Sequence, residues 1–138
     1  MQKFVPSQGD RPGAEPVSRK QLVLEVQGKT KLHCELKRHL APRTVGTIMR
    51  SLPLEGNVHM RGSGIAYIET AIDSGTEKSK TAFKKGDVAF LSSSGSMCFF
   101  VSDVAGKAMT PIGKMYGDIE KLKNIVPGDV IRLYEETV

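Results

Sequence analysis

The chain has 138 residues, of which 39% are apolar, which is enough for one domain around a single hydrophobic core. Its net charge of +5 is distributed along the sequence among 15 acidic residues, so we interpret the charges mainly as a solvated surface. The longest apolar run, Met97 to Val101, is far too short for a membrane-spanning helix, so no membrane partner is expected.

The first 20 residues contain three prolines and few apolar side chains. A segment of this composition buries little surface, so we expect residues 1–20 to form a flexible N-terminal tail. Residues 21–138 are then expected to form the folded domain.

The first predicted elements are a hairpin and a helix. Residues 22–26 and 31–37 flank a turn, and apolar and polar residues alternate strictly from Leu32 to Lys37, which predicts a strand with one buried face. Pro42 suits the first position of a helix. An apolar stripe follows it at helical spacing and predicts an amphipathic helix over about residues 42–52: Val45, Ile48, Met49 and Leu52.

The rest of the chain predicts short strands joined by turns. Residues 57–61 read as an edge strand, and residues 65–72 are apolar on both faces, as in an enclosed strand. Two further strands over 88–91 and 97–101 flank a serine-rich loop, and Asp118 is the expected N-cap of a short helix over about residues 118–124. A last strand covers residues 130–134. About eight strands with two short helices favour a mainly β fold, a sheet closed into a barrel with one helix over its mouth.

Two cysteines, Cys34 and Cys98, lie in predicted strands, and no secretory segment precedes them. We therefore expect reduced thiols packed in the core of a cytoplasmic protein.

Several kinds of site are disfavoured by residue spacing. The three histidines share no metal-ligand spacing, so neither a metal nor a cofactor is expected. Residues 92–96 lack the Gly-x-Ser-x-Gly pattern of a hydrolase nucleophile. Nucleic acid is also disfavoured, because no aromatic platform is interleaved with the basic residues that could contact phosphates: Arg11, Arg19, Lys20, Lys78, Lys80, Lys84 and Lys85.

Three segments together resemble the cyclophilins, in the order that this family has them. They are "ELKRHLAPRTVGTIM", "GSMCFFVSD", and "PIGKM" followed by "IEKLKNI", and they lie within residues 22–134. The short chain and the ending "VPGDVIRL" are most similar to the compact prokaryotic cyclophilin-like proteins of unestablished function. The resemblance implies a closed eight-stranded barrel with a groove on its outer wall.

The resemblance also implies site residues. Arg61, in "HMR", matches the arginine that weakens the amide bond of an X-Pro peptide in cyclophilins, and Phe100 matches a wall of the proline pocket. An edge-strand charge for Arg61 and a core position for Phe100 are the simpler alternatives. Other family groups are absent: Met97 or Cys98 replaces a glutamine, Met109 replaces a histidine, and the chain has no tryptophan.

These departures favour a binding module that holds a small molecule or an extended, proline-containing peptide in an apolar groove. The expected rim comprises Arg61, Tyr67, Met97, Phe100 and Met109. The alternative is a weak peptidyl-prolyl isomerase that uses Arg61 and Phe100. The ligand and the oligomeric state are left open by the sequence.

Overall fold

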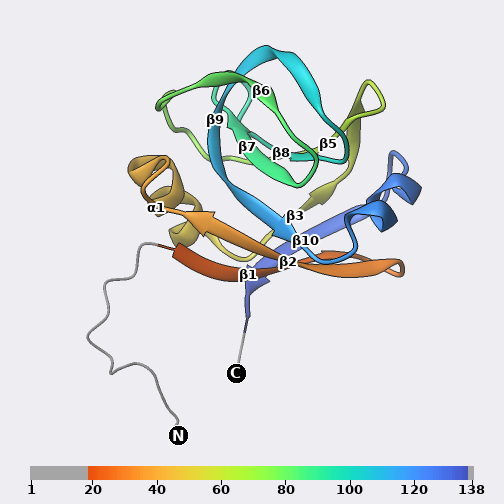
Figure 1. Ribbon diagram of the computed structural model, residues 1–138. Helices are drawn as coiled ribbons and strands as arrows, with labels where there is room; N and C mark the ends of the chain where they lie inside the picture. Colours follow the sequence, from red (N-terminus) through yellow and green to blue (C-terminus); the bar gives the residue numbers. More distant parts are fainter. Residues whose placement is uncertain (1–18, 137–138) are drawn as a thin grey trace, which may run out of the picture.

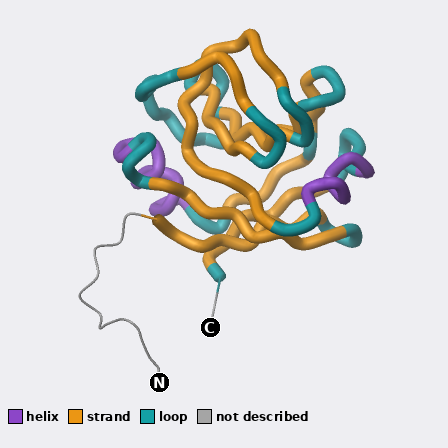
Figure 2. Tube along the Cα trace, in the orientation of Figure 1, coloured by secondary structure: helices purple, strands orange, loops and turns teal. Residues whose placement is uncertain are grey.

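A computed structural model describes residues 19–136, which form ten strands and two short helices (Figures 1 and 2). In chain order the elements are β1 (Arg19–Val26), β2 (Thr30–Lys37), α1 (Pro42–Ser51), β3 (Leu54–Asn57), β4 (His59–Arg61), β5 (Ile65–Glu69), β6 (Lys80–Phe83), β7 (Asp87–Leu91), β8 (Ser96–Phe100), β9 (Val104–Tyr116), the 3₁₀ helix η2 (Ile119–Asn124) and β10 (Val130–Glu135). Residues 1–18 of the predicted tail lie outside the described residues. Its last two residues, Arg19 and Lys20, belong to β1. No helix in the described part of the chain is long and apolar enough to cross a membrane.

The mainly β fold with two short helices is confirmed, but the strands do not form the predicted closed ladder of eight. Their order is β3-β10-β1-β2-β9-β7-β8-β5-β4, with β6 paired to β9, so the first and last strands of the chain are neighbours while β3 and β4 end the sheet. Between these two edge strands the Val58 amide donates to the carbonyl of Asp129 at 2.7 Å, and from His59 onward the chain pairs with β5. β3 lies close to β5 without pairing with it: a Cβ atom on Gly56 would lie 3.1 Å from the Cβ of Ile68.

The predicted hairpin and helix are both present. β1 pairs with β2 in the register Leu24↔Leu32, which buries the alternating apolar residues of β2. Val45 and Ile48 of α1 are fully buried, and Met49 and Leu52 pack against the same core. Asp118 precedes η2 as expected, but its side chain makes no capping hydrogen bond.

Strand β9 connects the two halves of the sheet (Figure 1). It pairs with β2 through Gly113–Tyr116 and with β7 through Thr110–Lys114, and its first half pairs with β6. At Gly113 the chain passes so close to β2 that a Cβ atom would lie 2.0 Å from the carbonyl oxygen of Glu35. Only glycine fits this crossing. The first half of β9 and all of β6 form a ribbon, here called the β6–β9 ribbon, over the outer face of β7 and β8.

Candidate binding site

The outer face of β5, β7 and β8 carries a second hydrophobic cluster, distinct from the main core. Successive residues of a strand face opposite sides, so Met97 and Phe99 enter the main core while Cys98 and Phe100 enter the second cluster. The ring of Phe83 in β6 stacks on Phe100 with centroids 4.7 Å apart, and Met109 of β9 joins the same cluster. The ribbon thereby covers one part of this face and leaves hollows beside it.

One hollow is a cavity of about 210 Å³, called here the Arg61 pocket. Its lining comes from β4, β5, the end of β7, the β7–β8 turn, β8 and the first half of β9: Arg61, Tyr67, Glu69, Leu91, Ser93, Ser94, Ser96, Cys98 and Lys107.

Strand register positions these side chains. Tyr67 lies opposite Cys98 and Glu69 lies opposite Ser96, so two residues of β5 and two of β8 face the pocket together. Tyr67 is also opposite His59 of β4, and their rings stack with centroids 5.3 Å apart. This stack fixes one wall of the pocket next to Arg61.

The charged groups at the rim have both signs. Arg61 and Lys107 are cationic, Glu69 is anionic, and all three are exposed. Among residues 19–136, the guanidinium of Arg61 makes no hydrogen bond or ion pair, so its N–H donors are available to a ligand. Serine hydroxyls add neutral donors and acceptors, with the oxygens of Ser94 and Ser96 2.8 Å apart. The rim can therefore contact a ligand that carries charges of both signs.

The floor of the pocket offers no reactive nucleophile. Burial raises the pKa of the Cys98 thiol to about 12, although the nearby charge of Arg61 acts in the opposite direction. At neutral pH the thiol is therefore protonated, and the thiolate is the reactive form. No group of side chains in the described residues could hold a metal ion.

The structure brings some of the predicted site residues together and separates others. Arg61 and Tyr67 line the same pocket. Phe100 and Met109 are buried in the second cluster, to which the ribbon itself contributes Met109, and Met97 is fully buried in the main core, so none of these three lines the pocket.

Sequence reasoning missed most of the polar lining. Glu69 is two residues from the predicted Tyr67, and Ser96 and Cys98 share a strand face with the predicted Phe100, so the period of a strand could have indicated them. Lys107 is likewise two residues from the predicted Met109, but no strand was predicted over these residues, so its period could not be applied there.

A family model described as Cyclophilin-like matches residues 20–134. The chain belongs to this family. The cyclophilin-like resemblance read from the sequence is therefore confirmed. No curated protein matches the chain.

Two solved structures share the fold of this cyclophilin-like protein. One is the hypothetical protein AF2241 from Archaeoglobus fulgidus, at 24% identity and a TM-score of 0.71, covering 89% of this chain and 99% of that one. The other is McbB in complex with tryptophan, at 16% identity and a TM-score of 0.72, covering 86% of this chain but only 46% of McbB. At these identities the likeness concerns the fold alone.

Proposed function

We propose that this protein is a binding module that holds a small molecule bearing a carboxylate in the Arg61 pocket. The observation that supports this most is the guanidinium of Arg61, which has no partner among residues 19–136 and stands at the rim of a defined cavity. Guanidinium and carboxylate groups match in geometry and form paired hydrogen bonds. A carboxylate is therefore the group that this rim suits best.

The remaining rim charges narrow the ligand to an amino-acid-like molecule. Lys107 adds a second cation for the carboxylate, while Glu69 supplies an anion for an ammonium group. A free amino acid carries both groups on one carbon atom. McbB, which has the same fold, is described in complex with tryptophan, and this is compatible with a small-molecule site on such a scaffold.

The size of the cavity favours a small molecule over an extended peptide. Sites for drug-sized ligands have volumes of about 300–1,000 Å³, and the Arg61 pocket has about 210 Å³. A peptide would lie largely outside it.

The isomerase alternative has less support. Phe100, its expected pocket wall, is fully buried and stacked on Phe83 instead of facing the pocket. Arg61 alone would then have to stabilise a twisted amide without an apolar wall to hold the proline ring. We therefore place binding ahead of catalysis.

Binding is tested by titrating the ¹⁵N-labelled protein with free amino acids and small carboxylic acids, one at a time, by NMR. We expect saturable shifts of the amides of Tyr67, Glu69, Cys98 and Lys107. Arg61→Gln should weaken binding at least tenfold, since hydrogen bonds to charged groups are worth about 1.5–3 kcal/mol. Arg38→Gln removes the same charge from an exposed turn outside the pocket and should leave the affinity unchanged. A complete panel without any saturable shift would refute the proposal.

Isomerase activity is tested separately, by following cis/trans exchange of an Ala-Pro peptide by NMR with and without the protein. Uncatalysed exchange takes tens to hundreds of seconds. We expect no acceleration. Acceleration that disappears in Arg61→Ala would instead establish the alternative.

A further inference from the structure

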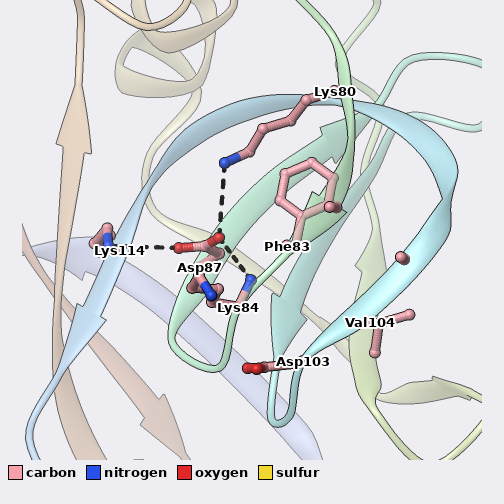
Figure 3. A pocket seen from close by; sticks show the side chains of 9 residues that line it. Lys80, Phe83, Lys84, Asp87, Asp103, Val104 and Lys114 are labelled. Carbon is pink, nitrogen blue, oxygen red and sulfur yellow. Dashed lines mark hydrogen bonds and ion pairs between the residues drawn. The ribbon is translucent and has the colours of Figure 1, made fainter.

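A second and larger cavity, of about 520 Å³, is lined by residues of the β6–β9 ribbon, the start of β7 and the second half of β9 (Figure 3). It is lined by three lysines, two aspartates and an apolar wall: Lys80, Lys84, Lys114, Asp87, Asp103, Ala82, Phe83, Val104 and Ala105. We call it the lysine cavity. It shares no lining residue with the Arg61 pocket.

Asp87 lies at the centre of the lysine cavity. Its side chain is only 10% exposed, and one of its carboxylate oxygens accepts a hydrogen bond of 2.9 Å from the backbone amide of Lys84. Figure 3 shows the ammonium groups of Lys80 and Lys114 approaching this carboxylate from two sides. The buried carboxylate of Asp87 thus holds the ammonium groups of Lys80 and Lys114 close together.

The two ammonium groups lie close to the carboxylate of Asp87 but do not form short hydrogen bonds with it. Their nitrogens lie 3.9 Å and 3.8 Å from its oxygens, beyond the 2.7–2.9 Å or so of a charge-assisted hydrogen bond. Both side chains are about half exposed, so their donors also face the cavity.

The remaining charged groups favour an anion as the ligand. Lys84 adds a third ammonium, which makes no ion pair within residues 19–136. The carboxylate of Asp103 already accepts a hydrogen bond of 2.8 Å from the backbone amide of Lys85. Three cations therefore surround the cavity, against two carboxylates that each accept one backbone hydrogen bond.

We propose that the lysine cavity is a second binding site, which takes a small phosphate-bearing molecule with an apolar part. The phosphate oxygens accept hydrogen bonds from Lys80 and Lys114, on the solvent side of Asp87, and lysine is a common ligand of phosphate. The apolar part lies against Val104 and Ala105, because the ring of Phe83 is buried and the ammonium of Lys80 lies 5.1 Å from its centroid. Asp87 positions the two lysines and does not contact the ligand.

The experiment is an NMR titration of the ¹⁵N-labelled full chain with inorganic phosphate, phenyl phosphate and phenol. We expect saturable shifts of the amides of Phe83, Lys84, Asp87 and Lys114 with both phosphates. Phenyl phosphate should bind more tightly, because its ring buries apolar surface against the wall. Phenol, which has the ring without the charge, should give no saturable shift.

Matched lysine variants decide whether the cavity is the site. Lys80→Gln and Lys114→Gln should each weaken phenyl phosphate binding about fivefold, and both should fold because these side chains are half exposed. Lys31→Gln, on the exposed face of β2, should have no effect, and neither should Arg61→Gln, which keeps this test independent of the proposed function. Unchanged affinity in both cavity variants, or shifts centred on the Arg61 pocket, would overturn the proposal.

Discussion

Cys98 illustrates how one residue restricts what the Arg61 pocket can do. Its thiol is part of the pocket lining but is 99% buried as a residue, exposing only 1% of its surface. Burial raises its pKa to about 12, more strongly than Arg61 lowers it. Burial likewise raises the pKa of Cys34 to about 12, and the charge of Glu35 adds to the effect. Both thiols are therefore apolar packing groups at physiological pH.

The raised pKa values of the thiols predict a loss of stability in alkali. Because each folded-state pKa of about 12 lies above the ordinary thiol pKa of 9.0, the protonated thiols contribute stability below pH 9 that is lost as the pH rises towards 12. Urea unfolding at a series of alkaline pH values should show this decline. It should be less steep in Cys34→Ala, which removes one titrating thiol, although the variant is less stable at neutral pH. Equal slopes in the two proteins would contradict the assignment.

At the scale of elements, helix α1 begins without a capping side chain of its own. Ala41 occupies the N-cap position, and the first turn has no acidic residue. The loop before β6 supplies the missing acceptor. One carboxylate oxygen of Glu77 accepts from the amide and the hydroxyl of Thr44, at 2.7 and 2.8 Å, and the other accepts from the amide of Arg43 at 3.3 Å. The loop and the helix therefore stabilise each other.

Glu77→Gln should destabilise the protein by about 1 kcal/mol at neutral pH, because it removes a carboxylate from the positive end of the helix dipole. Burial acts to raise the pKa of Glu77, but the hydrogen bonds from Thr44 and Arg43 outweigh it and hold the pKa below 4.5. Its contribution is therefore present above the pKa of the unfolded chain and disappears as the pH falls through the folded-state value. Urea unfolding of the wild type and of Glu77→Gln, at neutral and acid pH, measures this difference in the free energy of unfolding.

The control for Glu77 is Glu55→Gln, which removes an exposed carboxylate paired with Arg132 at the surface. We expect a smaller effect there, since exposed ion pairs contribute little. A difference between wild type and Glu77→Gln that persists unchanged at acid pH would show that the charge is not responsible.

The elements that the sequence predicted are those with a regular apolar pattern. Alternation in β2 and the stripe of α1 identify a buried face locally, and the adjacent Phe99 and Phe100 require both faces of β8 to be covered. β6 has no such pattern, because three of its four residues are exposed and only Phe83 is buried. Its partner in β9 is distant in sequence, so local patterns do not indicate the pairing. The contact of Glu77 with α1 is also between residues distant in sequence and could not be predicted for the same reason. The Arg61 pocket could be predicted only in part, because Lys107 lies on the ribbon, which forms only when β6 pairs with the distant β9.

For the molecule as a whole, the β6–β9 ribbon belongs to both cavities. It contributes Lys107 to the Arg61 pocket and Lys80, Phe83 and Ala105 to the lysine cavity. Within the described residues β6 pairs with β9 alone, whereas β7 and β8 have partners on both sides. A strand with one partner and exposed side chains opens at a lower free energy than strands of the core. A ligand in either cavity should therefore change the local stability of the ribbon.

Native-state hydrogen exchange tests this difference. The amides of Ala82 and Phe83 should exchange faster than those of Phe99 and Phe100, because the ribbon can open while the core strands remain paired. Saturating phenyl phosphate should slow exchange in the ribbon, since a ligand that binds only the closed form stabilises it by an amount that rises with the logarithm of the ligand concentration. In Lys114→Gln the slowing at the same phenyl phosphate concentration should be about fivefold smaller, in line with the weaker binding, although the ribbon of the free protein still opens before the core. Equal rates in β6 and β8 would mean that the ribbon opens only when the entire sheet unfolds.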